Sequence, residues 1–145
     1  MQTLSQSDID LYERKLPKFE EFVKTWADYL ILVRGILGTK LEDDPVAMDF
    51  QAREIEQHKV KVGKLLAFAE EYLDQAEYSA LKGIGQRQKD KTDLDRETQL
   101  NSVCGFERRF RNEVLNISKT IQERVSYAQT RLRVFASADG NKLVA

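Results

Sequence analysis

The fold is decided by residues 45–80, which read PVAMDFQAREIEQHKVKVGKLLAFAEEYLDQAEYSA. Apolar residues recur through this stretch in steps of four and three, and only Lys59 places a charge in the series. The members of the series are Met48, Ala52, Ile55, Val62, Leu66, Ala69, Leu73, Ala76 and Ala80. This spacing lines up one apolar stripe along a helix, and such a stripe needs a partner surface to cover it.

A second apolar series of the same kind lies near the C-terminal end of the chain. Its members are Phe110, Val114, Ile117, Ile121, Val125, Ala128, Leu132 and Phe135. Two steps of four follow one another between Ile117 and Val125, an irregularity that relaxes left-handed supercoiling. The two series predict long helices over about 45–82 and 93–135, joined by one connector. We therefore expect an antiparallel helical hairpin or coiled coil.

The N-terminal region predicts two further helices. A hydroxyl and acidic residues at Ser7, Asp8 and Asp10 favour a helix start, and we expect this helix over 8–16. Pro17 then interrupts the helix, and an amphipathic helix follows over 18–37. The aromatic side of that helix carries Phe19, Phe22, Trp26 and Leu30. At the other end of the chain, residues 136–145 lose the apolar period and predict a flexible tail.

Composition agrees with an all-α chain forming a single domain over residues 1–145. The chain is 41 % hydrophobic and 32 % charged, and it has only two prolines and seven glycines. Such a mixture is typical of helices with densely charged outer faces, and no segment alternates with a strand period. Narrow stripes give a thin core, so we expect a homo-oligomer.

The net charge of −1 conceals an asymmetry along the chain. Residues 82–145 hold 13 basic against 8 acidic residues, whereas residues 1–81 hold 10 basic against 16 acidic residues. This distribution is compatible with an anionic ligand at the C-terminal half or with head-to-tail contact between subunits. An unevenly charged, fully solvated surface explains it equally well.

The connector between the long helices is a candidate nucleic-acid-binding segment. Arg87, Lys89 and Lys91 place three cations there, among glutamines and glycines. Flexible basic segments bind phosphate backbones by releasing counterions, without sequence-specific geometry. The alternative interpretation is a hairpin loop that charge keeps soluble.

A cluster of arginines on the last helix is the second candidate. Arg108, Arg109 and Arg111 are flanked by Phe106 and Phe110. Guanidinium and aromatic groups side by side are typical of proteins that bind single-stranded nucleic acid. In the alternative interpretation both phenylalanines pack inward, and the arginines project outward or pair with acids on another helix. Residues 100–135 hold seven basic against three acidic residues, which favours a basic face.

No catalytic or metal-binding pattern accompanies these features. The only cysteine, Cys104, lies far in sequence from the only histidine, His58, and we interpret it as a small buried hydrophobe. Zinc-ligand spacing, a P-loop and a dinucleotide fingerprint are all missing from the sequence. We predict no enzyme activity, no cofactor and no metal site. Lacking a secretory signal and a membrane span, the chain is expected to be cytoplasmic and to make no membrane contact.

The aromatic side of the helix over 18–37 allows two interpretations. Its four named residues, Phe19, Phe22, Trp26 and Leu30, are richer in aromatic surface than either apolar series. They cover the two long helices, or they form an interface with another subunit or client helix. We therefore treat them as candidate protein-interface residues, with another protein as the expected partner.

The order of elements resembles that of phage recombination mediators of the UvsY type. The resemblance rests on an apolar N-terminal helix, two long helices and the connector Leu81-Lys-Gly-Ile-Gly-Gln-Arg-Gln-Lys89. It implies a non-enzymatic, oligomeric accessory factor that helps a recombinase load onto strands coated with single-strand-binding protein. The alternative is a protein–protein adaptor, a secretion or export chaperone, or a virion structural component. Type III and flagellar secretion chaperones are similar in helical style.

Overall fold

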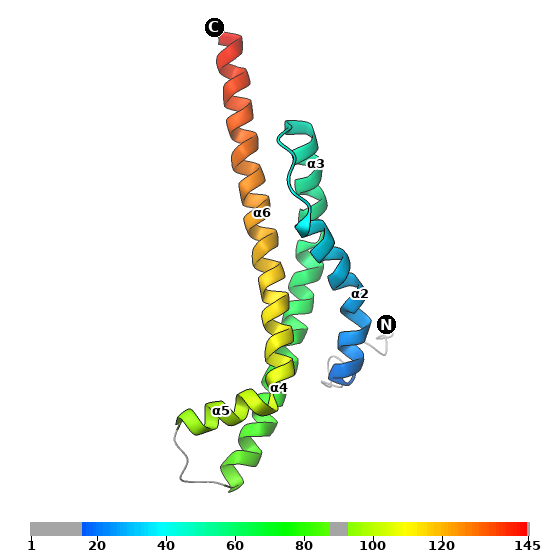
Figure 1. Cartoon of the computed structure of the whole chain (residues 1–145), viewed down its shortest axis with the longest axis vertical. Coiled ribbons are helices and arrows are strands. Elements are labelled where there is room, and N and C mark those ends of the chain that lie inside the picture. Colours follow the sequence, from blue (N-terminus) through cyan, green and yellow to red (C-terminus); the bar gives the residue numbers. More distant parts are fainter. Residues whose placement is uncertain (1–15, 88–92, 145) are drawn as a thin grey trace, which may run out of the picture. The chain divides into compact units, whose positions relative to one another are not determined.

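A computed structural model describes the backbone of residues 16–87 and 93–144 and the side chains of residues 16–82 and 97–138 (Figure 1). The described helices are α2 (Phe19–Gly38), α3 (Pro45–Glu56), α4 (Lys59–Arg87), α5 (Asp93–Val103) and α6 (Gly105–Val144). No strand occurs within these ranges, and the predicted all-α class is confirmed. The helix predicted over 8–16 lies outside the described residues except for Leu16, which is not helical.

The chain divides into two compact units, and the division falls after Ile31, inside α2. Helix α2 starts with Glu20 and Glu21 in its first turn, where carboxylates oppose the partial positive charge of a helix N-terminus. It continues through Gly35 and ends at Gly38, where the Thr39 hydroxyl donates to the Gly35 carbonyl at 3.1 Å. The predicted bounds of 18–37 are therefore accurate to one residue.

Side-chain hydrogen bonds hold the segment between α2 and α3 in the second unit. An Asp44 carboxylate oxygen accepts from the Ala47 backbone N–H at 2.9 Å and caps α3, and Pro45 occupies the first turn. The Gln51 amide accepts from the Glu42 N–H at 2.8 Å and donates to the Lys40 carbonyl at 3.3 Å. We call residues 39–44 the 39–44 loop, and α3 holds this loop in place.

The single helix predicted over 45–82 is wrong, because the structure interrupts it at Gln57 and His58. Lys59 would fall on the apolar stripe of an unbroken helix, and the interruption leaves this residue exposed at the start of α4. In α4 the predicted members Val62, Ala69 and Leu73 are buried, whereas Leu65 is 0 % exposed in place of the predicted Leu66, which is half-buried. Helix α4 then continues past the predicted stop at residue 82 to Arg87.

The helix predicted over 93–135 also consists of two helices. It is interrupted at Cys104, whose N–H donates to the Leu100 carbonyl at 2.7 Å and whose carbonyl accepts from the Arg108 N–H at 2.9 Å. Leu100 and Cys104 pack with Leu73 of α4 in one buried cluster. Burial of α5 against α4 therefore redirects the chain before α6 begins, and Gly105 follows directly after the change of direction.

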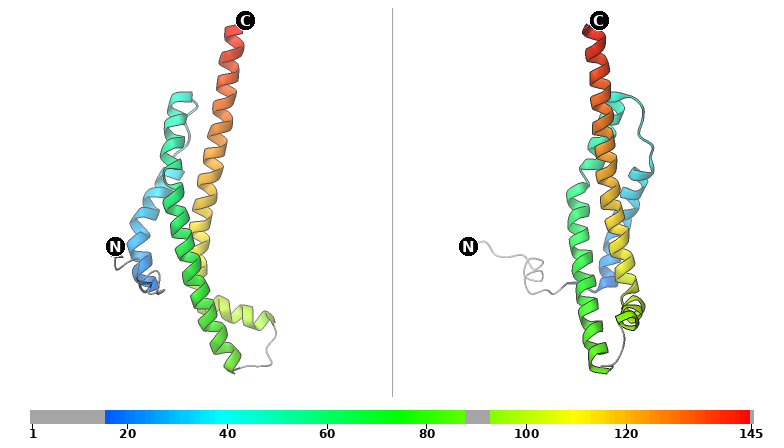
Figure 2. Two further views of the ribbon diagram at one scale, coloured as in Figure 1. Left: turned by 180° about the vertical axis from the view of Figure 1, so that it is seen from behind. Right: turned by 90° about the vertical axis from the view of Figure 1, so that its left-hand side faces the viewer.

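Helix α6 supplies the longest apolar stripe, and it packs against both α3 and α4 (Figures 1 and 2). Its positions 110, 114, 117, 121, 125 and 128 are all buried, as the second apolar series predicts. Ala128 packs with Met48 and Ala52 of α3, and Leu132 and Phe135 cover the edge of that cluster. The predicted helix end at 135 is wrong, because α6 continues to Val144 through a polar sequence that contains no proline.

Two neighbouring substitutions test which of Leu65 and Leu66 is the more deeply buried in α4. Leu65→Ala removes a fully buried side chain, and we expect it to lower the free energy of unfolding by about 2–5 kcal/mol. Leu66→Ala should cost less, because Leu66 is half-buried. Urea unfolding followed by circular dichroism measures both changes. A larger loss for Leu66→Ala would show that Leu66 is the more deeply buried of the two, as the apolar series predicts.

Candidate functional site

Arg108 links three helices at the junction of α5 and α6. Its Nε donates to Glu77 Oε1 of α4 at 3.1 Å, and its Nη1 donates to Glu97 Oε1 of α5 at 2.8 Å. Nη1 also donates to the Asn101 side-chain oxygen. The hydrogen bond to Glu97 is the main cause that raises the pKa of Arg108. We call Arg108, Glu77, Glu97 and Asn101 the Arg108 cluster. Arg108, which the sequence predicts to bind nucleic acid, therefore has a structural role.

Arg109 lies in a different environment from its neighbour. Its guanidinium carbon is 5.3 Å from the centre of the Phe106 ring, and Phe106 is 72 % exposed. The interpretation that both phenylalanines pack inward is therefore wrong for Phe106 and correct for Phe110, which is buried. An exposed aromatic ring under an exposed guanidinium offers both stacking surface and positive charge.

Arg111 is half-buried on the same turn of α6 as the Arg108 cluster. Its Nε and the Glu107 Oε2 atom are both buried and have no hydrogen-bond partner among the described residues. Among the other predicted nucleic-acid ligands, Arg87 is the last residue of α4, and Lys89 and Lys91 lie outside the described residues. The structure thus separates three adjacent arginines that the sequence treats alike.

Two more basic residues of α6 hold the 39–44 loop. Arg131 Nη2 lies 2.9 Å from Asp43 Oδ1, and the Arg131 guanidinium lies 5.0 Å from the centre of the Phe135 ring. Arg124 Nη1 donates to the Thr39 carbonyl at 3.3 Å. The hydrogen bond to Asp43 raises the pKa of Arg131. Part of the predicted basic face is therefore occupied by contacts within the chain.

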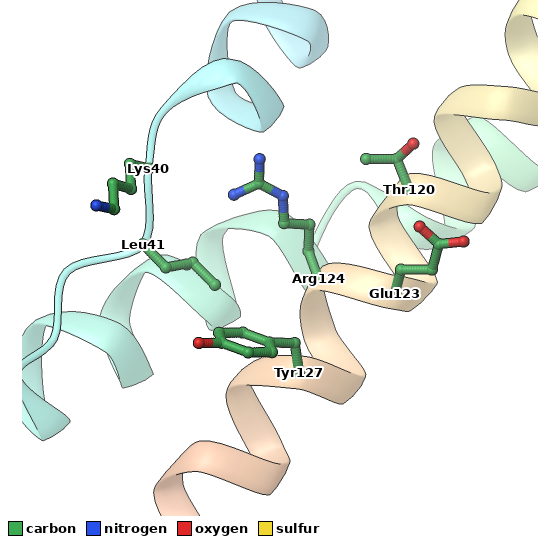
Figure 3. Close-up of a pocket in the computed structure, with 6 residues that line it drawn as sticks. All are labelled: Lys40, Leu41, Thr120, Glu123, Arg124 and Tyr127. Carbon is green, nitrogen blue, oxygen red and sulfur yellow. The ribbon is translucent and has the colours of Figure 1, made fainter.

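An open pocket of about 350 Å³ lies between the 39–44 loop and α6 (Figure 3). Its lining residues are Lys40, Leu41, Thr120, Glu123, Arg124 and Tyr127. Figure 3 shows the Leu41 side chain directed toward Tyr127, with Arg124 extending from α6 toward the loop. A second pocket of about 330 Å³ shares Thr120 and extends along α6 to Glu113. We call the two together the loop groove, a feature that the sequence analysis missed because its walls come from distant segments.

The predicted protein-interface residues of α2 lie in the first unit. Phe22 and Leu30 are buried, and Phe19 and Trp26 are half-buried. The Trp26 ring centre lies 6.4 Å from that of Phe22 and 5.8 Å from that of Tyr29, with an edge-on geometry to Tyr29. Tyr29 belongs to this aromatic cluster although the sequence analysis did not select it, and burial raises the pKa of its hydroxyl.

The thiol of Cys104 is buried beneath the Arg108 cluster. Burial raises its pKa most, the carboxylates of Glu107 and Glu77 raise it further, and Arg108 opposes the change. No group of three or more histidine, cysteine and acidic side chains that could hold a metal ion occurs in the described part of the chain. Within that part, no helix combines the length and apolar character that crossing a bilayer requires.

Comparison of the protein with protein-family models, with curated proteins and with solved structures finds no match. The α5–α6 junction, the loop groove and the aromatic cluster of α2 are therefore the candidate functional features of the protein.

Neighbouring arginines should respond differently to substitution. Arg108→Ala removes the donor shared by Glu77 and Glu97, and we expect it to lower the free energy of unfolding by about 1 kcal/mol. Arg109→Ala should change the free energy of unfolding by less than about 0.5 kcal/mol, because no ion pair is described for Arg109. Thermal and urea unfolding compare the two variants. Equal stability of Arg108→Ala and the unsubstituted protein would contradict a structural role for Arg108.

The thiol of Cys104 should resist alkylation in the folded protein. Its raised pKa lowers the thiolate fraction at any pH below the pKa, and burial blocks the reagent. At pH 8 we expect iodoacetamide to modify the native thiol at least tenfold more slowly than the thiol of the protein unfolded in urea. Mass spectrometry of timed samples gives both rates. Comparable rates would show that the α5–α6 junction opens freely.

Proposed function

We propose that the protein is a non-enzymatic, oligomeric helical assembly protein that binds single-stranded nucleic acid at the junction of α5 and α6. The observation that carries the proposal is the exposed pair of Phe106 and Arg109. Because bases of any sequence stack on aromatic rings, such a pair suits a strand bound without sequence preference. Arg87, the last residue of α4, and Lys89 and Lys91, which follow it in the sequence, are the proposed source of further positive charge.

In this proposal the Arg108 cluster has a positioning role. It ties α5 and α6 to α4 through ion pairs at 2.8 and 3.0 Å, so Phe106 and Arg109 are presented from a fixed turn of helix. The strand would contact Arg109 and the cations Arg87, Lys89 and Lys91, with Arg111 at the edge of the site. Phosphate contacts of this kind give affinity that falls as salt rises.

The proposal includes an antiparallel coiled coil between the α3–α4 segment and α6. Met48 packs with Ala128 near one end of this pair, and Leu73 packs with Cys104 near the other. Residue numbers thus rise along one segment as they fall along the other, which supports opposite chain directions. Large apolar side chains remain on the outer faces, and these favour self-association.

The resemblance to UvsY-type recombination mediators suggests a cellular role for the proposed binding of single-stranded nucleic acid. The protein would act as an accessory factor that helps a recombinase replace single-strand-binding protein on DNA, in a cytoplasmic setting. A second candidate function is that of a protein–protein adaptor, a secretion or export chaperone, or a virion component. The half-buried pair of Trp26 and Tyr29 favours this candidate, because partly exposed aromatic side chains are enriched at protein interfaces.

Binding to a fluorescent oligothymidylate tests the proposed nucleic-acid site. The logarithm of affinity should fall linearly with the logarithm of salt concentration, and replacing Arg87, Lys89 and Lys91 by alanine should reduce the slope by about 2. Phe106→Ala should weaken binding by about 1 kcal/mol or more at every salt concentration, because stacking carries no counterion. Fluorescence anisotropy across a salt series separates the two effects.

A control variant removes two cations outside the α5–α6 junction: Lys119 and Arg133, both exposed on α6, are replaced by alanine. Adding Phe106→Ala to this control variant should weaken binding by the same free energy as Phe106→Ala does in the unsubstituted protein. An absence of binding at low salt would exclude the nucleic-acid proposal and favour the adaptor. A loss of affinity per removed charge that is equal in the control and in the triple variant would show only diffuse attraction to positive charge.

A further inference from the structure

The outer face of α4 carries a second stripe, on the side away from its buried residues. Its members are Val60, Gly63, Ala67, Glu70, Asp74, Tyr78 and Leu81, all of them exposed. They follow one another in steps of three and four, which places them on one side of the helix. We call this set the outer α4 stripe. It spans ~32 Å at the rise of an α-helix.

Both the large and the small members of the stripe indicate a partner helix. Val60 is 68 % exposed and Tyr78 is 70 % exposed, although neither residue type is favoured at isolated surface positions of a helix. A Cβ added at Gly63 would meet no atom within 4 Å, so no described neighbour requires a glycine there. Glycine is also a poor helix former. A helix approaching closely over Gly63 and Ala67 accounts for both small residues.

Helix α6 presents a matching face beside the 39–44 loop. Its large exposed apolar residues, Phe106, Tyr127 and Val134, are separated by multiples of seven and therefore lie on one side of the helix. The loop groove lies on this side, with Leu41 and Tyr127 facing each other inside it (Figure 3). Lys40 and Arg124 place two cations at the same pocket, against the single carboxylate of Glu123.

Charge selects which faces pair. The outer α4 stripe has Glu70 and Asp74 at its centre, so two such stripes in contact would bring carboxylates together. The loop groove has Lys40 and Arg124 beside its apolar residues and only Glu123 as an acid there, because Glu113 is paired with Arg34. The excess of positive charge complements the two acids of the stripe. The favourable pairing is therefore the outer α4 stripe with the loop groove, and these two surfaces belong to different faces of the chain.

We propose that the outer α4 stripe of one copy docks in the loop groove of a second copy. The inference rests on the self-association in the proposed function and names its interface. Such a contact joins unlike surfaces, so each bound copy still offers one free stripe and one free groove. Assembly then continues to a ring or a filament, where contact between like surfaces would stop at a dimer.

Charge reversal on each surface tests the pairing by sedimentation velocity at low salt. Glu70→Lys with Asp74→Lys makes the stripe basic, and Lys40→Glu with Arg124→Glu makes the groove acidic. Each double variant alone should associate at least about tenfold more weakly than the unsubstituted protein, because like charges then meet. An equal mixture of the two variants, and a single chain carrying all four substitutions, should both recover association.

Matched controls keep the test specific. Lys119→Glu with Arg133→Glu makes the same charge change on another side of α6 and should leave association unchanged. Circular dichroism checks folding, and the stripe variant alters only exposed side chains, so it remains informative if Arg124→Glu loosens the 39–44 loop. Recovery in the mixture without recovery in the four-fold variant would indicate stripe-to-stripe contact and overturn the inference.

The outcomes separate this inference from the proposed function. If the unsubstituted protein is a monomer at every concentration, self-association fails and the interface fails with it. If it assembles and both double variants assemble equally well, the self-association stands and this interface is wrong. Assembly that stops at a dimer would likewise overturn the pairing of unlike surfaces.

Discussion

The apolar stripe of α6 is the constraint on which the second unit depends. From Phe110 to Ala128 every stripe position is buried. Helix α3 covers the end of the stripe at Ala128, and α4 also packs against α6. A single long helix cannot bury such a stripe alone, so α3 and α4 must lie along it. That arrangement also fixes the 39–44 loop and α5. Arg124 and Arg131 of α6 bind the loop, and Leu100 of α5 packs with Leu73 of α4.

Periodicity was sufficient to predict the helices but not their interruptions. The series from Phe110 to Ala128 names buried residues correctly because α6 is continuous there and one face decides burial. In the other series the charged member Lys59 indicates that one continuous helix would place a charge on the apolar stripe. It does not show that the chain avoids this by ending α3 at Glu56 and starting α4 at Lys59. The chain turns at Gln57 and His58, where the His58 N–H donates to the Ile55 carbonyl, and the apolar spacing alone contains no signal for that turn.

The candidate site shows the same limit more sharply. Arg108 and Arg109 are adjacent and chemically identical, and the sequence gives no reason to assign them different roles. Glu77 and Glu97 decide the matter, because they reach Arg108 from two other helices. The loop groove was beyond sequence reasoning for a related reason: Leu41 and Tyr127 are 86 positions apart and meet only because Asp43 and Thr39 bind α6.

The turn between α3 and α4 has a consequence for how the second unit opens. Met48, Ala52 and Ala128 form one buried cluster, and Leu73, Leu100 and Cys104 form another. The break between α3 and α4 lies between these two clusters in the sequence. Residues that are joined by continuous packing and hydrogen bonding unfold together. The helical segments around each cluster can therefore open, and exchange their amide hydrogens, as separate cooperative units. Thermal fluctuation can then release α3 while the α4–α5 end stays closed.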